Sequence, residues 1–205
     1  DRSPSRGLGD VYKRQGEGAD AVNYETIMYE AYGPAGVAIL IECLTDNRNR
    51  AVSDVRVAVT RNGGTMADGG SVQRLFQRKG VVSVSKTYEV EEGRKTETRE
   101  VDEDQLMEAT IDAEPEDIVD EGEVFEIISD PSAVVDVRKA VQGAGIDYDS
   151  AEVSFKPDFT QRVELEDARK LYRILDALED LDDVQNVFSN VDIPAEVAAA
   201  LDEEE

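Results

Sequence analysis

The sequence predicts an α+β fold of two sandwich domains, each with helices on one face of an antiparallel sheet, and with the second domain inserted into the first. Three observations lead to this prediction. Short apolar runs with the period of a strand alternate with runs that have the period of a helix. Their order is ββαβ, then a complete αββαβ series, then a closing αβ pair. Because the first series lacks the αβ pair that the last segment supplies, the first domain is expected to be discontinuous.

The first domain begins with two predicted strands. Residues 23–32 alternate as a strand does, and Gly33-Pro34 predicts a turn after them. Residues 37–44 are almost continuously apolar, which predicts a strand buried on both faces. The only cysteine, Cys43, lies in this run and is expected to be a small core residue.

Residues 51–60 fit a helix and, through three alternating valines, also a strand. Thr45-Asp46 is a good N-cap signal before them, and Asn62-Gly63-Gly64 is a good stop after them, so a helix is favoured. Residues 71–84 predict a short strand, a turn at Lys79-Gly80, and a second strand.

The inserted series follows a charged stretch, residues 89–105, which is expected to be a solvated connector or an extended hairpin. Beyond Pro157, six apolar residues of the segment 164–181 lie on one helical face, and the segment is the clearest helix of the chain. This helix is expected to pack on residues 22–82. The other predicted elements are helices near 102–113 and 132–143, strands near 117–120, 123–129, 150–156 and 184–191, and a frayed end over 195–205.

The predicted domains are a discontinuous domain of residues 16–82 plus 160–205 and an inserted acidic domain of residues 83–159. Residues 1–15 have no helical or strand period and are rich in Ser, Pro and Gly, so they are interpreted as a non-native cloning remnant or a disordered segment. We expect them to make no consistent contacts with the rest of the chain.

The net charge is −25, but the charge is unevenly distributed. Residues 89–130 hold 18 acidic and three basic side chains, whereas residues 46–80 hold seven basic and three acidic ones. An acidic body repels nucleic acid phosphates, so residues 46–80 are the segment where such a contact is expected.

The composition argues against an enzyme. The chain has no histidine, which excludes Ser-His-Asp and Cys-His catalysis and His-ligated zinc. No P-loop or dinucleotide fingerprint is present, and no cofactor or small-molecule substrate is expected. No apolar run reaches the length of a membrane span and no secretory leader opens the chain, so a cytoplasmic protein without a membrane partner is expected.

Two short motifs bear on binding. The Gly33–Gly36 segment matches the GxxG loop of KH domains, but it joins two strands and carries no basic residue, so a plain turn is favoured. The segment 46–50, Asp-Asn-Arg-Asn-Arg, does not suit calcium because Arg48 stands where a ligand is needed. Two guanidinium groups at a helix N-terminus suit a phosphate, and a capped helix start with solvated arginines is the alternative. Acidic pairs such as Asp102/Asp104 and Asp182/Asp183 are interpreted as solvated faces.

Several stretches resemble the YebC family, the bacterial relatives of the mitochondrial translational activator of cytochrome c oxidase subunit I. The resemblance covers roughly residues 22–192, with Ala35, Ala51 and Phe188 as departures from the family pattern. The matching segments are residues 29–38 (YEAYGPAGVA), 42–50 (ECLTDNRNR), 62–64 (NGG), 70–72 with 75–76 and 78–80 (GSV, LF, RKG), and 175–187 (LDALEDLDDVQNV).

The resemblance implies a non-enzymatic gene-expression regulator, either a ribosome-associated translation factor that helps synthesis through proline-rich stretches or a DNA-binding transcriptional regulator. It also implies a basic N-terminal domain, absent from this chain, that supplies much of the affinity for ribosomal RNA or DNA. Together with the basic segment 46–80, it makes the following residues the candidate nucleic-acid contacts: Arg48, Arg50, Asn47, Asn49, Lys79 and Tyr32. The competing hypothesis makes Arg48 and Arg50 internal ion-pair partners of the many carboxylates.

Overall fold

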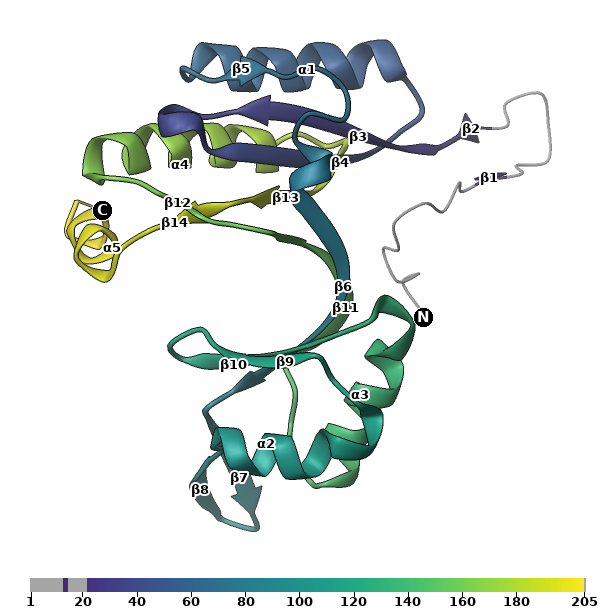
Figure 1. Ribbon diagram of the computed structural model, residues 1–205, viewed down its shortest axis with the longest axis vertical. Coiled ribbons are helices and arrows are strands. Elements are labelled where there is room, and N and C mark those ends of the chain that lie inside the picture. Colours follow the sequence, from purple (N-terminus) through teal and green to yellow (C-terminus); the bar gives the residue numbers. More distant parts are fainter. Residues whose placement is uncertain (1–12, 15–21, 205) are drawn as a thin grey trace. The chain divides into compact units, whose positions relative to one another are not determined.

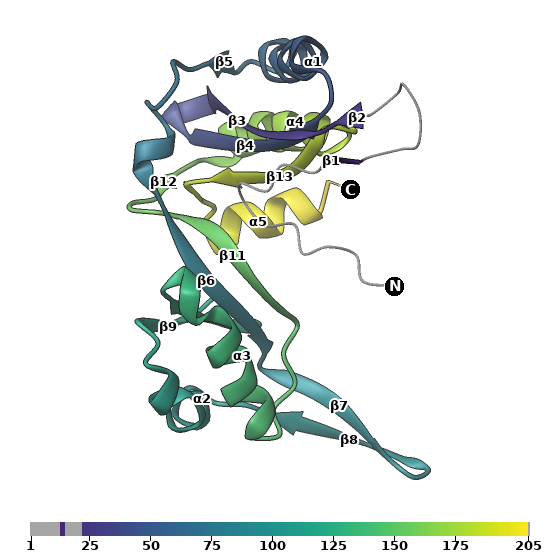
Figure 2. The same cartoon turned by 90° about the vertical axis from the view of Figure 1, so that its right-hand side faces the viewer.

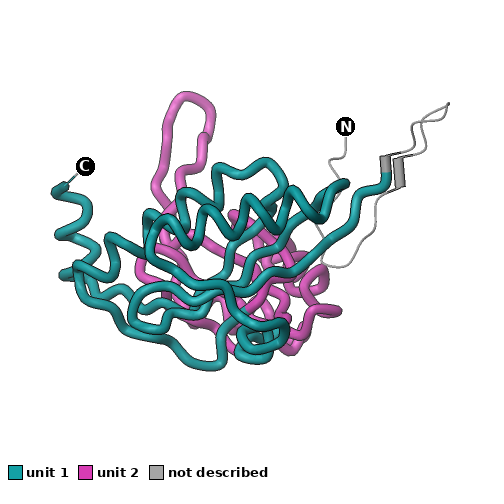
Figure 3. Tube along the Cα trace, turned by 90° about the horizontal axis from the view of Figure 1, so that it is seen from above, with its two compact units in different colours: residues 1–77, 156–205 teal, residues 78–155 magenta. Residues whose placement is uncertain are grey.

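The computed structural model describes residues 13–14 and 22–204 and has the predicted α+β architecture (Figure 1). The chain divides into two compact units, drawn in different colours in Figure 3. Unit 1 contains residues 1–77 and 156–205, and unit 2 contains residues 78–155. Unit 2 is therefore inserted into unit 1 along the sequence.

Unit 1 is built on a four-stranded antiparallel sheet with the order β13-β4-β3-β5. The closing αβ pair belongs to this unit, because β13 pairs with β4. Two short strands, β12 and β14, pair in parallel beside it. The elements of unit 1 are β2 Val22–Asn23, β3 Glu25–Tyr32, η1 Pro34–Gly36, β4 Ala38–Thr45, α1 Arg48–Arg61, β5 Thr65–Met66, η2 Gln73–Leu75, β12 Gln161–Arg162, α4 Leu165–Glu179, β13 Val184–Ser189, β14 Val191–Asp192 and α5 Ala195–Asp202.

Helices α1 and α4 contact each other and share one core with the sheet. Strand β4 is buried over almost its whole length, as its continuous apolar run predicts. The predicted helical face of the segment 164–181 is also confirmed. Four of its six apolar residues are fully buried in this core, and Leu175 and Leu181 pack against it; the four are Ala168, Leu171, Ile174 and Leu178.

Cys43 is fully buried in this core, as expected, and burial raises the pKa of its thiol to about 12. We predict that iodoacetamide will not alkylate the folded protein at pH 8 and will alkylate it rapidly in urea, with mass spectrometry as the measurement.

The neutral Cys43 thiol favours the folded state, and this contribution to stability is complete below the unfolded-chain pKa of about 9. It is lost as the pH rises toward 12, so stability should fall over that interval. Cys43→Ala should make this fall smaller and leave the part that comes from Tyr29, whose pKa burial also raises.

Unit 2 has its own four-stranded sheet, with the order β11-β6-β10-β9, and a separate core that includes Leu106 of α2 and Val137 of α3. The charged stretch forms an extended hairpin, β7 with β8, which Figure 2 shows projecting from the unit. The elements are β6 Phe76–Ser85, β7 Thr87–Glu92, β8 Lys95–Glu100, α2 Glu103–Thr110, η3 Ile111–Ala113, β9 Asp117–Asp120, β10 Val124–Ser129, η4 Pro131–Ala133, α3 Val134–Gly143 and β11 Ser150–Pro157.

The turn predicted at Lys79-Gly80 is wrong, because β6 runs without interruption through both residues. Gly80 pairs with Ser129 of β10. A Cβ atom at position 80 would lie 2.6 Å from the Ser129 hydroxyl oxygen and 2.8 Å from the Cβ atom of Val134. The glycine therefore permits the close approach of neighbouring chain rather than a change of direction.

Two expectations about the chain ends also change. Residues 195–202 form helix α5, not a frayed end, and Val197 is buried in the core of unit 1. At the other end, Lys13 and Arg14 form β1, which pairs with β2, so the expectation of no contacts is wrong for these two residues. The rest of the predicted segment 1–15 lies outside the described residues.

Candidate nucleic-acid interface

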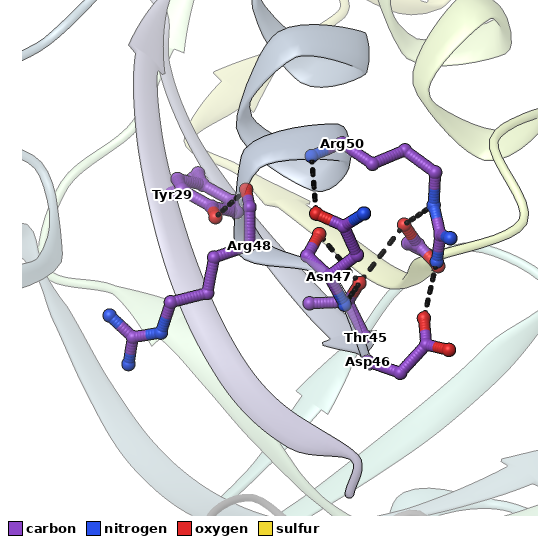
Figure 4. Close-up of polar contacts among 7 residues, drawn as sticks. Tyr29, Thr45, Asp46, Asn47, Arg48 and Arg50 are labelled. Atoms are coloured by element: carbon purple, nitrogen blue, oxygen red, sulfur yellow. Dashed lines mark hydrogen bonds and ion pairs between the residues drawn. The ribbon is translucent and has the colours of Figure 1, made fainter. Parts of the chain in front are cut away.

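The candidate interface begins at the N-terminus of α1, where the chain leaves β4 (Figure 4). The Thr45 hydroxyl oxygen accepts a hydrogen bond from the Asn47 backbone N–H at 3.0 Å. The Asn47 Oδ1 atom accepts one from the Arg50 backbone N–H at 3.0 Å. The N-cap is therefore Asn47, not Thr45 or Asp46 as predicted, and its side chain satisfies a backbone donor of the first helical turn.

The Arg50 guanidinium group lies between two carboxylates. It donates to both oxygens of Asp183, at 3.1 and 3.0 Å, and to Asp46 at 2.7 Å. The side chain of Asp183 is only 14% exposed. The hydrogen bonds that Arg50 donates to Asp183, and then to Asp46, raise the pKa of Arg50. The Thr45 hydroxyl group also donates a hydrogen bond to Asp183 at 3.1 Å. Together these contacts connect the start of α1 to the loop before β13.

Carboxylates also dominate the surface beside Arg50. A hollow of about 530 Å³ there is lined by three aspartates and a single cationic residue. Its lining residues are Tyr24, Leu44, Asp46, Arg50, Asp182, Asp183 and Gln185. Such a hollow repels a phosphate. The geometry therefore favours the competing hypothesis for Arg50, in which its side chain is an internal ion-pair partner of carboxylates.

Arg48 is different, because its side chain is 69% exposed and has one partner among the described residues. Its guanidinium group donates two hydrogen bonds to Glu25, the longer of them at 2.9 Å. The hydrogen bond from Arg48 lowers the pKa of the Glu25 carboxyl group. A single exposed ion pair of this kind exchanges readily with solvent and other ligands.

Of the remaining predicted residues, the structure places only Asn49 on α1. Asn49 is exposed beside Arg48 in the first turn. Tyr32 lies at the opposite end of β3 from Glu25, roughly 23 Å away at the rise of a strand. Lys79 belongs to unit 2, where its ammonium group pairs with Glu116 at 2.7 Å.

Two acidic residues interpreted as solvated have definite partners. Asp183 holds Arg50, although 133 residues separate the two in sequence. Asp102 is the N-cap of α2 and forms a capping box with Gln105. The Asp-x-x-Gln spacing is a local signal that could have identified Asp102. No local pattern links Asp183 to Arg50.

The Gly33–Gly36 segment is a turn between two strands, which the sequence favoured over a KH-type loop. It forms the one-turn helix η1 between β3 and β4. Ala35 has a φ of 57°, a left-handed conformation that glycine adopts more readily.

Within residues 13–14 and 22–204, no group of three or more acidic or cysteine side chains could hold a metal ion. No helix of the described chain is long and apolar enough to cross a membrane.

Comparison with known proteins gives a consistent result. The family model described as the TACO1/YebC second and third domain matches residues 24–191. A probable transcriptional regulatory protein of Cutibacterium acnes is 98% identical over 195 residues, which cover 95% of this chain and 74% of the relative. One from Mycobacterium tuberculosis is 54% identical over 202 residues, 98% of this chain and 76% of the relative. The crystal structure of a conserved hypothetical protein from Aquifex aeolicus is similar, with a TM-score of 0.72, 35% identity, and coverage of 88% of this chain and 68% of that one.

Proposed function

Because the chain belongs to the TACO1/YebC family, we propose that it is a non-enzymatic, cytoplasmic regulator of gene expression that acts by contacting nucleic acid. The observation that carries the proposal is the family match over residues 24–191, together with close relatives named as regulatory proteins. The absence of histidine from the sequence fits this proposal, because binding needs no general base.

The leading form of the proposal is a translation factor that docks on ribosomal RNA and assists synthesis of proline-rich stretches. It rests on the family resemblance of the segments around residues 29–50 and 175–187. The second form is a DNA-binding transcriptional regulator, which the names of the relatives favour.

One experiment separates the two forms. This chain and the longer Cutibacterium acnes relative are each tested for co-sedimentation with ribosomes and for binding to promoter DNA fragments. The translation form predicts sedimentation with ribosomes and no preference among DNA sequences. Sequence-selective DNA binding without ribosome association would overturn it.

All four predicted contacts at the start of α1 are exposed, but Asn47 caps the helix and Arg50 pairs with Asp46 and Asp183. Arg48 and Asn49 are therefore the two that suit a phosphate. We predict that Arg48→Ala weakens RNA binding. It should also make the negative slope of log affinity against log salt less steep by about 0.7. Glu25→Gln should have the opposite effect on affinity, because it removes the carboxylate that competes for Arg48. Fluorescence anisotropy with a labelled single-stranded RNA, measured over a salt series, gives both quantities.

Two further variants serve as controls. Arg56→Ala removes an exposed arginine of the same helix, and its affinity should change less than that of Arg48→Ala. Arg50→Ala should lower the melting temperature, because it leaves Asp183 without its guanidinium partner. Equal affinities for wild type, Arg48→Ala and Glu25→Gln would show that Arg48 does not contact RNA.

A further inference from the structure

A second group of cations lies at the other end of the helical layer of unit 1. The end of α1 next to β5 and the turn η1 meet α4 there (Figure 1). They surround a hollow of about 400 Å³ that contains three basic side chains and one acidic side chain. Its lining residues are Pro34, Arg61, Asn62, Gly63, Asp167, Lys170 and Arg173.

The three cations are held on a rigid frame. Lys170 and Arg173 are three residues apart on α4 and therefore share a face of that helix. Leu171 and Ile174, between and beside them, are fully buried and fix the rotation of α4. Arg61 is the last residue of α1, which ends at the C-cap Asn62. The cations thus converge before any ligand arrives, which reduces the entropy cost of binding.

The three cations also lack ion-pair partners among the described residues. Among the described residues, no carboxylate lies within 4.0 Å of the guanidinium or ammonium group of Arg61, Lys170 or Arg173, and all three are exposed. The chain holds 47 acidic and 22 basic side chains, so a cation has many potential partners. Four other arginines of unit 1 do have carboxylate partners: Arg48, Arg50, Arg162 and Arg169. Arg56 and Arg74 are exposed and have none among the described residues, so the three cations are distinguished by their convergence on one hollow.

Local helix stability explains only part of this arrangement. A cation in the last turn of a helix is favoured by the helix dipole, and this accounts for Arg61. Lys170 and Arg173 lie in the middle of α4, where the dipole gives no such reason. With three cations and the single carboxylate of Asp167, the hollow has a net charge of +2 inside a chain of net charge −25.

We propose that this hollow, formed by Arg61, Lys170 and Arg173, binds the phosphodiester backbone of a nucleic acid. The inference rests on the proposed function and gives it a second contact surface on unit 1. Guanidinium groups bind phosphate oxygens in a fork, and an ammonium group acts as a point charge on a neighbouring phosphate. Because the three cations are exposed and do not enclose a small ligand, they suit an extended polyanion.

The position of Tyr32 agrees with this assignment. Its backbone carbonyl oxygen would lie 3.0 Å from a Cβ atom at Gly64, the neighbour of the lining residue Gly63. Tyr32 is therefore at the same end of unit 1 as the hollow, and not beside Arg48. Phosphate contacts position a protein without carrying sequence information, so RNA and duplex DNA should both use these cations.

The test is the double variant Lys170→Ala, Arg173→Ala in the full chain, with labelled single-stranded RNA and labelled duplex DNA as separate probes. At low salt we expect affinity to fall by at least about tenfold for both probes, with the salt slope for RNA reduced by about 1.4, or 0.7 for each contact. The matched control, Arg56→Ala with Lys95→Ala, removes the same charges from exposed positions outside the hollow. Its affinity should fall much less, and all variants should keep the wild-type melting temperature. The charge-preserving exchange Lys170→Arg, Arg173→Lys should retain most of the affinity.

A second probe separates failure of this site from failure of the proposed function. Inorganic tripolyphosphate is titrated into the labelled protein and followed by amide NMR signals, which should shift at residues 61–63 and 167–173 in the wild type only. If nucleic acid binds but the double variant and its control lose affinity equally, the proposed function stands and this site is refuted. If tripolyphosphate shifts these signals while neither RNA nor DNA binds, the anion site exists but the nucleic-acid assignment and the proposed function fail. Unchanged signals at these residues would overturn the site itself.

Discussion

Replacing Glu30 with alanine is expected to lower the free energy of unfolding by about 2–4 kcal/mol, a large part of the stability of an ordinary domain. Glu30 lies on β3 and is 6% exposed. Its carboxylate accepts three backbone hydrogen bonds, from Gly70 at 2.6 Å and from Val72 and Gln73 at 2.7 Å each. Val72 is fully buried, so its N–H group has no access to water when the acceptor is removed.

Graded variants make this prediction specific. Glu30→Gln keeps one oxygen acceptor but places an amide donor opposite a backbone donor, so its loss should be intermediate. Glu91→Ala, at an exposed position in another strand, should leave stability unchanged. Urea unfolding followed by circular dichroism gives the free energies, and hydrogen exchange of residues 70–75 reports the local effect. A loss below about 0.5 kcal/mol for Glu30→Ala would contradict the anchoring role, because such values are typical of surface substitutions.

Ile174→Ala is the second substitution with a large expected effect, about 2–5 kcal/mol. Ile174 is fully buried on α4, and its Cδ1 atom would lie 3.1 Å from a Cβ atom at Gly64. Truncation removes side-chain atoms from the place where α1, α4 and the sheet meet, and it leaves a cavity there. Because the two units have separate cores, the damage should be confined to unit 1.

Hydrogen exchange tests this confinement. In Ile174→Ala, the amides of α1 and β4 should lose protection, whereas those of β10 should keep theirs. Leu106→Ala, at a fully buried position in the core of unit 2, should give the reverse pattern. Tyr172→Ala, on the exposed side of α4, should change neither unit. Equal loss of protection in both units for either core variant would show that they unfold as one cooperative body.

Much of the fold follows from local patterns in the sequence. The apolar run around Cys43, the face that includes Leu171 and Leu178, and the order of elements predicted the core strand, the α4 helix and the α+β class. These features depend on the period at which apolar residues recur along the chain. Burial of the apolar face of each helix or strand is the main source of its stability. The prediction of a turn at Gly80 was wrong because it also relied on local sequence alone. A glycine signals either a bend or a close approach, and only the neighbouring atoms of Ser129 and Val134 distinguish them.

The sequence by itself determined the fold class, the family resemblance and the location of a basic segment in an acidic chain. Only the tertiary structure decided which basic side chains keep an available charge. Arg50 is paired by Asp183 from a distant loop, whereas Arg61, Lys170 and Arg173 converge from two helices that are more than 100 residues apart in the chain. The physical reason is that electrostatic interaction depends on distance in space and not along the chain, so the charge of a segment does not reveal which of its cations are already neutralised.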